Sequence, residues 1–347
     1  MQGTMIEVLA LIVFTGNVFT RRIPRVLCAL HGVSPRDRWL CVLPGWRMNV
    51  NVNVNMSLSA AHFQVVNVFT STVFSGNPTC VVFPAKSMMH MSDEWMIKVA
   101  RETAQPTTSF VDLEMGTVRM FNLHGKEMAI LSGHTCLGVA AAVRARTGLS
   151  AVDLTSIYGK VSLRSDGLMY EVALPSGKGS AMETVPRATL EEALNIKGSD
   201  ILQHGLVLGG KFMFAELTPE AFASLTPDIP AILKLEAFGV FACTAGAVTQ
   251  QKDYLPECAV GVLEQRTDFT VRNFVPALGI DEDMATGSIQ VFLNRYFAEK
   301  LGRAPEEPMY CLQASRRGGL IRSRSADECV YVAGSCALSL QGTIPLT

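Results

Sequence analysis

The chain has 347 residues, of which 48% are hydrophobic and 18% charged, and its formal net charge is −1. These values exclude an intrinsically disordered chain, which needs fewer apolar and more charged residues. There is no basic excess that would indicate a nucleic acid as partner, and the apolar runs are shorter than the ~20 residues of a membrane-spanning helix. We therefore expect a globular protein of about two domains of ~150 residues each, with no nucleic-acid or membrane partner.

The nine cysteines are dispersed along the chain and form no Cys-x-x-Cys pair. An odd, scattered set is typical of reduced thiols in an intracellular protein, rather than of a disulfide framework or a zinc site. The sequence therefore predicts a cytoplasmic protein without a metal site.

The N-terminal segment differs in composition from the rest. Residues 1–55 hold six arginines and no lysine, with Glu7 and Asp37 as their acidic residues. Their net charge is +4, which leaves −5 for the remainder because the total is −1. With no sustained helical or strand period, residues 1–60 are expected to be a disordered extension outside the fold. The alternative is a mitochondrial transit peptide, which is also arginine-rich and acid-poor.

From Phe63 onward the pattern is that of a compact α/β protein. A first helix is predicted after Ser92, which has the side chain of an N-cap, and it ends before Pro106. A second helix opens at Ser132 and runs to about Arg146, and its surface is apolar nearly all round, as in a helix at the centre of a domain. Strands are expected near 63–70, 79–83, 109–114, 118–121, 160–165 and 169–174.

The second half repeats this scheme. Residues 286–288, Thr-Gly-Ser, are expected to open another mostly apolar central helix that ends near Leu301. The pattern predicts an α/β (α+β) fold of two related domains, residues 61–175 and 186–347, with the final strands free to cross back to the first domain. Strands are expected near 204–209, 212–216, 237–243, 258–263, 268–274, 309–315 and 329–340.

The two central helices begin with small, glycine-containing polar turns. A helix N-terminus presents unpaired N–H groups and the positive end of a dipole, so it favours anions. Gly133 and Gly287 would let a ligand approach the backbone closely, and the turns also carry His134, Asp283 and Ser288. Two such turns facing one cleft would hold a small carboxylate-bearing molecule beside proton-transfer groups.

Several separated stretches together resemble the PhzF family of phenazine biosynthesis-like isomerases. The stretches that carry the resemblance are Val68–Thr70, Phe74–Pro78, Ala100–Glu102, Phe110–Val111, Gly133–Thr135, Arg272–Pro276, Gly279–Ile280, Glu282–Asp283, Thr286–Ser288, Ser315 and Arg317–Gly319. The resemblance covers about residues 63–342. It implies the diaminopimelate-epimerase-like fold of two pseudo-symmetric domains, each a sheet around a central helix.

The resemblance also implies an activity. Family members move a proton between carbons of an amino- or hydroxy-substituted ring acid, need no metal or organic cofactor, commonly form homodimers and belong to biosynthetic processes. Their catalytic glutamate falls here on Thr107, a poor general base at neutral pH unless another base activates it. The other site positions match at Gly133, His134, Asp283 and Ser288, while Ser132 replaces the usual cysteine and Gly287 lies beside Ser288.

Two interpretations of Thr107 stay open. Asp283 and His134 together perform the proton transfer, as a carboxylate and an imidazole do in general acid–base catalysis, and the protein is an isomerase of small cyclic or amino carboxylic acids. Alternatively, the protein has kept the binding scaffold and lost the chemistry, and it binds a small molecule or a partner. A two-cysteine racemase is disfavoured, because Ser132 stands where the first thiol would be.

Overall fold

The computed structural model describes residues 39–43, 46–50, 60–84, 91–128, 131–176, 182–248 and 267–346. The chain forms two compact units, residues 1–57 and residues 58–347. In the first, β1 (Trp39–Leu43) pairs antiparallel with β2 (Trp46–Val50), a hairpin that the sequence pattern did not predict. The other residues of the expected disordered extension up to Ser59, and the strand expected near 258–263, lie outside the described residues.

The second unit holds two runs of strands, each with one long buried helix. The first run consists of β3 (Ala60–Val68), β4 (Asn77–Phe83), α1 (Asp93–Thr103), β5 (Thr107–Asp112), β6 (Thr117–Asn122), α2 (Gly133–Thr147), β7 (Ala151–Ser156), β8 (Gly159–Ser165) and β9 (Tyr170–Pro175). Both helices of this run lie where the sequence predicts them. The sequence pattern did not predict β7, a strand in which Leu154 is the one buried residue.

The second run begins after α3 (Arg187–Leu194) and a short 3₁₀ turn, η2 (Gly198–Asp200). It consists of β10 (Ile201–Val207), β11 (Phe212–Leu217), α4 (Pro219–Ala223), α5 (Ile229–Leu233), β12 (Gly239–Ala245), β13 (Phe269–Val275), η3 (Pro276–Leu278), β14 (Ile280–Asp283), α7 (Gln290–Lys300), β15 (Met309–Gln313), β16 (Gly319–Ala326), β17 (Cys329–Gly334) and β18 (Cys336–Pro345). The sequence pattern did not predict α3, α4, α5, β14 or β16.

The two runs have the same strand connectivity. In the first, the successive pairs from β3 to β9 are antiparallel, parallel, antiparallel, parallel, antiparallel and antiparallel. The pairs from β10 through β13 and from β15 to β17 follow the same series. In each half the second parallel pair is connected by the central helix: α2 lies between β6 and β7, and α7 lies between β13 and β15. This repetition confirms the predicted mixed α/β fold of two pseudo-symmetric halves.

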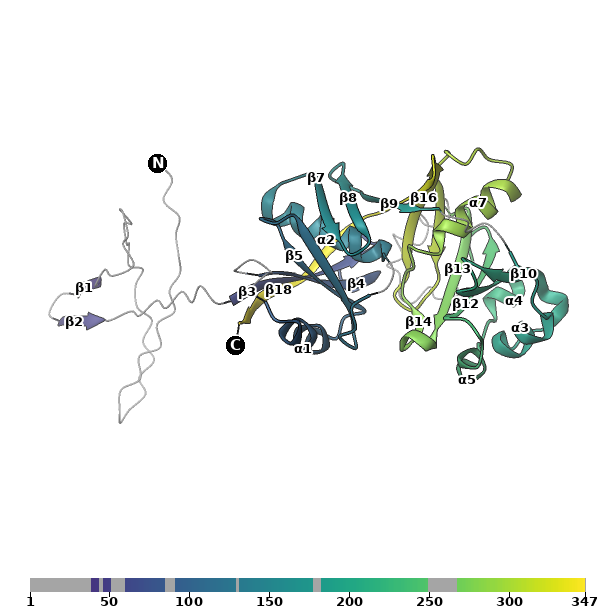
Figure 1. Ribbon diagram of the computed structural model, residues 1–347, viewed down its shortest axis with the longest axis horizontal. Helices are drawn as coiled ribbons and strands as arrows, with labels where there is room; N and C mark the ends of the chain where they lie inside the picture. Colours follow the sequence, from purple (N-terminus) through teal and green to yellow (C-terminus); the bar gives the residue numbers. More distant parts are fainter. Residues whose placement is uncertain are drawn as a thin grey trace. The chain divides into compact units, whose positions relative to one another are not determined.

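The central helix of the first half is enclosed by its sheet. In α2 every residue from Gly133 to Val143 is buried, and the helix contacts β3, β4, β8, β9 and β18 (Figure 1). α7 packs on β16 and β17. A helix with no solvent-facing side cannot show an amphipathic stripe, which explains why α2 is apolar along most of its length, whereas α7 also carries the buried polar residues Gln290 and Asn294.

The halves share strands and one hydrophobic core. β17 pairs with β9 of the first half, and β18 pairs with β3 along nine residue positions. A single buried cluster contains Leu137 of α2 together with Phe292 of α7. Because the halves share strands and a core, residues 58–347 form one compact unit. We retain the division into domains 61–175 and 186–347 as a proposal. Among the described residues, no helix is long and apolar enough to cross a membrane.

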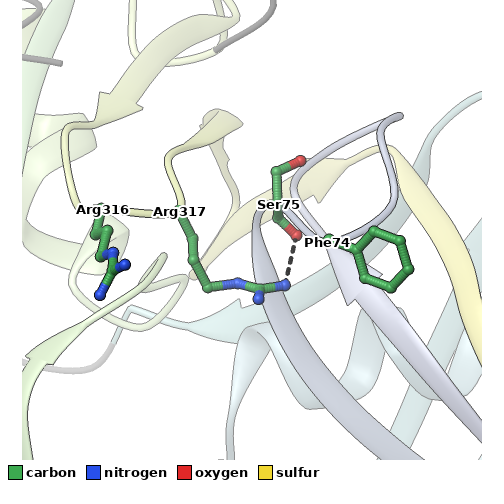
Figure 2. A pocket seen from close by; sticks show the side chains of 4 residues that line it. All are labelled: Phe74, Ser75, Arg316 and Arg317. Atoms are coloured by element: carbon green, nitrogen blue, oxygen red, sulfur yellow. Dashed lines mark hydrogen bonds between the residues drawn. The ribbon is translucent and has the colours of Figure 1, made fainter. Parts of the chain in front are cut away.

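A loop from each half meets at the junction. Arg317 donates from Nε to the carbonyl oxygen of Gly76 at 2.8 Å. Its Nη2 donates to the carbonyl oxygen of Ser75 at 3.1 Å (Figure 2). The backbone N–H of Gly76 donates to the carbonyl of Arg317 at 3.2 Å. These contacts fix residues 75–76 directly before β4, the strand that carries part of the site described below.

Gly138 lets α2 lie close to β4. A Cβ atom at this position would clash with Cγ2 of Thr79. We predict that Gly138→Ala lowers the free energy of unfolding by about 1–3 kcal/mol, as overpacking of a filled core does, although alanine favours helix more than glycine. Urea denaturation measures the loss. In a Thr79→Ser background, which removes the clashing methyl group, the same substitution should cost much less, and an equal cost in both backgrounds would contradict this packing account.

Candidate functional site

The turns that precede the two central helices touch through their glycines. A Cβ atom built on Gly133 would lie 3.3 Å from the Cα of Gly287, and one built on Gly287 would lie 3.2 Å from the Cα of Gly133. Any larger residue at either position would push the two turns apart. The sequence predicted that Gly133 and Gly287 belong to one site, and the structure brings their backbones into contact.

His134, in the first turn of α2, is buried between two hydroxyl groups. Its Nδ1 lies 3.0 Å from Oγ of Ser132, and its Nε2 lies 3.2 Å from Oγ1 of Thr107. Burial lowers the pKa of His134 to about 4, so the imidazole is neutral at pH 7. A neutral ring has one donor and one acceptor nitrogen, which means that one of the two hydroxyls donates to it and the other accepts.

Thr107, at the start of β5, is the centre of a small buried hydroxyl cluster. Thr135 donates to Oγ1 of Thr107 at 2.8 Å, and Oγ1 of Thr79 lies 2.7 Å away. With His134 at 3.2 Å, three groups surround the one hydroxyl. The Thr107 hydroxyl is therefore in contact with a neutral imidazole, whose burial disfavours the uptake of a proton.

Asp283, the last residue of β14, is held by donors from both halves of the fold. Asn77 donates from Nδ2 to Oδ1 at 2.9 Å, and Thr286 donates from Oγ1 to Oδ2 at 2.5 Å. Burial raises the pKa of Asp283 to about 6, although these two hydrogen bonds to the charged form lower it in part. Asp283 is thus mainly ionised at pH 7 and takes up a proton about two pH units above an ordinary aspartate.

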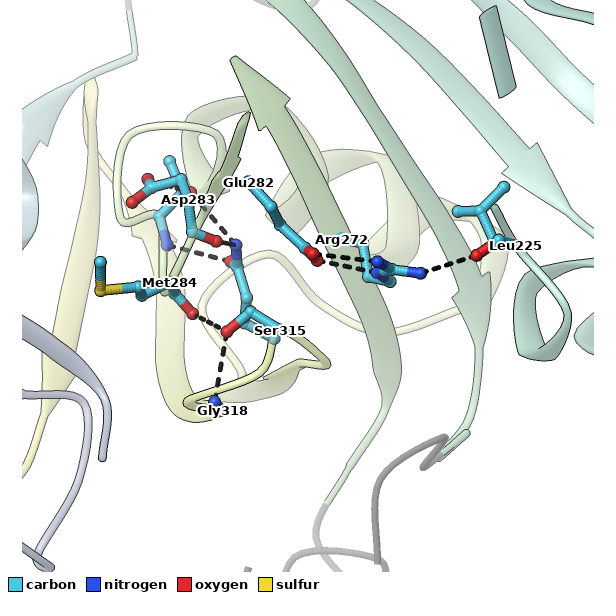
Figure 3. Close-up of polar contacts among 9 residues, drawn as sticks. Leu225, Arg272, Glu282, Asp283, Met284, Ser315 and Gly318 are labelled. Carbon is cyan, nitrogen blue, oxygen red and sulfur yellow. Dashed lines mark hydrogen bonds and ion pairs between the residues drawn. The ribbon is translucent and has the colours of Figure 1, made fainter. Parts of the chain in front are cut away.

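The neighbouring carboxylate is directed elsewhere. Glu282 forms a two-bond ion pair with Arg272, at 2.7 and 2.9 Å, and points away from Asp283 (Figure 3). Arg272 also donates to the carbonyl of Leu225. Successive side chains of a strand point in opposite directions. Glu282 therefore points toward Arg272, and Asp283 points toward Asn77 and Thr286.

Buried amides hold the turn after Asp283. Gln313 accepts from the backbone N–H of Thr286 at 2.9 Å and donates to the carbonyl of Asp283 at 2.9 Å. Asn273 donates to Oγ1 of Thr286 at 3.0 Å. Ser315 donates to the carbonyl of Met284 at 2.5 Å (Figure 3). The Thr286 hydroxyl thus accepts hydrogen bonds from the amides and donates its own hydrogen bond to Asp283. This donor stabilises the ionised form of the Asp283 carboxyl.

The second central helix begins later in the chain than the sequence predicts. The sequence predicted that Thr286, Gly287 and Ser288 open it, whereas α7 begins at Gln290. Thr286 is drawn into the amides around Asp283, and the N–H of Gln290 donates to the carbonyl of Gly287 in a tighter turn. Ser288 lies in that turn, half-buried.

β4 links the two groups of polar side chains. Asn77 and Thr79 are two positions apart on this strand and therefore lie on the same face, about 7 Å apart along the chain. Asn77 reaches Asp283 and Thr79 reaches Thr107, which contacts His134. The structure thus joins Thr107, His134 and Ser132 by direct contacts and connects them to Asp283 through one strand.

Several of these polar residues were not identified from the sequence. Asn77 and Thr286 lie inside the motifs that carry the family resemblance, but their roles as donors to Asp283 depend on long-range contacts. A signal was available for Asn77, since a polar residue between a turn and a β-branched buried strand needs partners when buried. Thr79, Thr135, Asn273 and Gln313 carry no such local signal. No cluster of three or more potential metal-ligating side chains is found in the described parts of the chain.

Thr286 should set the protonation of Asp283. We predict that Thr286→Val raises the pKa of Asp283 above its value of about 6, by about 1–2 units, because the substitution removes a charge-assisted donor to the ionised form. A pH titration of the carboxyl carbon by NMR measures it. Thr286→Ser keeps the donor and should leave the pKa nearly unchanged. A pKa that stays the same or falls in Thr286→Val would show that this hydrogen bond does not hold the carboxylate.

Comparison with known proteins agrees with the fold. The family model described as phenazine biosynthesis-like protein (PhzC-PhzF) matches residues 66–342. An uncharacterized isomerase of Pseudomonas aeruginosa is 28% identical over 291 residues, which cover 82% of this chain and 98% of that protein. The human phenazine biosynthesis-like domain-containing protein is 24% identical over 296 residues, covering 81% and 97%.

A solved structure extends this similarity to three dimensions. The crystal structure of a PhzF-family protein from Enterococcus faecalis aligns with a TM-score of 0.66 at 25% identity, over 82% of this chain and 99% of that chain. The matched part corresponds to the second compact unit, and the family model spans nearly all of it. The chain therefore belongs to the PhzC-PhzF family of phenazine biosynthesis-like proteins.

Proposed function

We propose that the protein is an isomerase that moves a proton between carbons of a small cyclic or amino carboxylic acid. The observation that carries this proposal is that one strand, β4, contacts Asp283 through Asn77 and is connected through Thr79 and Thr107 to the buried His134. Buried titratable groups with perturbed pKa values are typical of acid–base sites, and burial lowers the pKa of His134 and raises that of Asp283.

The chemistry follows from these protonation states. Asp283 takes a proton from a carbon next to an electron-withdrawing group, and the electron pair of the broken C–H bond moves into the conjugated system. The protonated Asp283 then returns the proton to another carbon of the same molecule. No oxidant or reductant is consumed. A pKa near 6 suits both steps at neutral pH, because a general base works best when its pKa lies near the operating pH.

The positions around the reacting groups provide binding. In this proposal the carboxylate of the substrate lies at the Gly133 turn, where α2 begins and its N-terminal N–H groups favour an anion, and next to Gly287, which contacts Gly133. Ser132 and Ser288 add hydroxyl groups beside these turns. In this proposal, His134 and Thr107 face the substrate opposite Asp283, with Nε2 of His134 3.2 Å from the Thr107 hydroxyl. A homodimer, independence from cofactors, a cytoplasmic location and a role in a biosynthetic process are further proposals from family membership.

Solvent exchange tests the proposal directly. The wild-type protein in deuterated water is expected to incorporate deuterium into at least one acid of a broad panel of cyclic and amino carboxylic acids. Asp283→Asn should lower the rate by about 100-fold or more, as the loss of a general base does. The rate should rise with pH through about 6, because Asp283 accepts a proton only when ionised. Mass spectrometry follows the label.

Asp281 provides the matched control. It is an exposed aspartate on the same short strand, so Asp281→Asn should leave the rate of exchange unchanged. Absence of exchange in every acid of the panel, or an equal rate in Asp283→Asn and the wild type, would overturn the assignment of Asp283.

A second candidate function is a scaffold that binds a small molecule or a partner without isomerase chemistry. The observation that favours it is the Thr107 hydroxyl, which lies within contact of Thr79, Thr135 and His134 where the family has a carboxylate. A hydroxyl so surrounded has little capacity left for a substrate proton.

Restoring the carboxylate discriminates between the two functions. If the scaffold has lost its chemistry, Thr107→Glu should gain proton exchange that the wild type and Thr107→Gln lack, since glutamine has the same size without a base. Because Thr107 is buried, circular dichroism has to show that the variants fold. Wild-type exchange as fast as that of Thr107→Glu rejects the scaffold function.

A further inference from the structure

Phe69, the residue directly after β3, has a backbone conformation that phenylalanine disfavours. Its φ is +65°, in the left-handed region that a bulky residue rarely adopts. Two hydrogen bonds to the second half of the fold hold it there. The N–H of Leu320 donates to the carbonyl of Phe69 at 2.9 Å, and the N–H of Thr70 donates to the carbonyl of Ser335 at 3.1 Å. Strained conformations of this kind persist only where the surroundings hold them, and they cluster at functional sites.

The phenyl ring of Phe69 packs against glycines of the second half. Phe69 is buried, with 1% of its surface exposed. A Cβ atom built on Gly334 would clash with Cδ1 of the ring. One built on Gly319 would lie 3.4 Å from Cβ of Phe69, and one built on Gly287 would lie 3.3 Å from Cζ. The absence of side chains at these three glycines therefore makes the room that the ring occupies.

The far end of this ring reaches a turn of the candidate site. Cζ is the ring atom that lies closest to the Gly287 position, and Gly287 also contacts Gly133. Thr286, the residue before Gly287, donates to Asp283. The Gly287 turn is thus in contact with both Gly133 and the tip of the Phe69 ring. A displacement of this turn would alter the hydrogen bond that Thr286 donates to Asp283.

We propose that Phe69 is a positioning residue of the acid–base site, whose ring holds the Gly287 turn in place and so keeps Thr286 on Asp283. The backbone alone does not require phenylalanine here, because glycine adopts a φ of +65° without steric cost. What phenylalanine adds is a rigid ring that reaches from Gly334 to Gly287. In this proposal Phe69 acts through the turn and not on the substrate. Its effect on catalysis rests on the proposed function, whereas its effect on the turn and on the protonation of Asp283 does not.

Phe69→Leu in the full chain tests the proposal, because leucine keeps an apolar side chain and removes the ring tip that reaches Gly287. In NMR spectra of ¹⁵N-labelled protein, the amide signals of Gly287 and Gly133 are expected to shift. The pKa of Asp283 should rise above about 6, by less than in Thr286→Val, because the Thr286 donor is displaced rather than removed. In proton exchange, kcat should fall by about tenfold or more, since a small displacement of reacting groups is costly. KM should change less, because the N–H groups of α2 that bind the carboxylate stay in place.

Two variants serve as matched controls. Phe222→Leu removes the ring of another fully buried phenylalanine, which lies on α4 in a separate hydrophobic cluster. Phe74→Leu changes a phenylalanine that has a similar φ, +67°, but a side chain that is 69% exposed. Neither control should shift the signals of Gly287 and Gly133 or the pKa of Asp283.

Urea denaturation shows whether Phe69→Leu is folded. If it is not, Phe69→Met, whose flexible side chain fills irregular gaps, takes its place with the same expected shifts. The proposal is overturned if the folded variant keeps the Gly287 and Gly133 signals and the pKa of Asp283 at their wild-type values, or if Phe222→Leu changes them equally. Because these signals are read without a substrate, absence of exchange in every acid would overturn the proposed function and would not affect this test.

Discussion

The hydrogen bond from Asn77 to Asp283 is the interaction on which the candidate site depends. It joins residues 206 positions apart in the sequence, one at the start of β4 and the other at the end of β14. Asn77 also donates to the carbonyl of Ala285 at 2.8 Å, so one amide fixes both the carboxylate and the turn that follows it. The contact of Gly133 with Gly287 requires that same turn to be in place. Without the amide, the two halves would keep their sheets but lose the alignment of their polar groups.

The surroundings of the two titratable residues account for their different protonation states at neutral pH. His134 is buried between hydroxyls, which cannot compensate a positive charge, and stays neutral. Asp283 is half-buried; desolvation of its carboxyl raises the pKa, and two donors retain part of the preference for its charged form. Burial therefore favours the uncharged form of both groups. The hydrogen bonds from Asn77 and Thr286 lower the pKa of Asp283 in part, so this carboxyl is mainly ionised at neutral pH while His134 is neutral. Thr107, which we propose stands where the family has its glutamate, lies 3.2 Å from the imidazole of His134.

The fold was largely predictable from the sequence, and the site only in part. The apolar stretches after Ser132 and Ser288 indicated central helices because a helix inside a sheet has no polar face, and the family motifs indicated the pseudo-symmetric halves. The start of α7 was predicted too early, since Thr286 is taken into a buried amide network that local propensity does not reveal. The same holds for Asn77, whose role depends on contacts more than 200 residues away. The short helices α4 and α5 are too short to show a hydrophobic period, although each begins with a capping side chain, Thr218 or Asp228, and a proline in its first turn.

The most direct test of the account is a crystal structure of the protein with a small conjugated carboxylic acid bound. We predict that one acid molecule lies at the junction of the Gly133 and Gly287 turns, with a carbon atom within about 3.5 Å of an Asp283 carboxylate oxygen and its opposite side facing His134 and Thr107. An acid that contacts only one of Asp283 and His134, or that leaves this junction empty at saturation, would contradict the claim that the two groups act on one substrate.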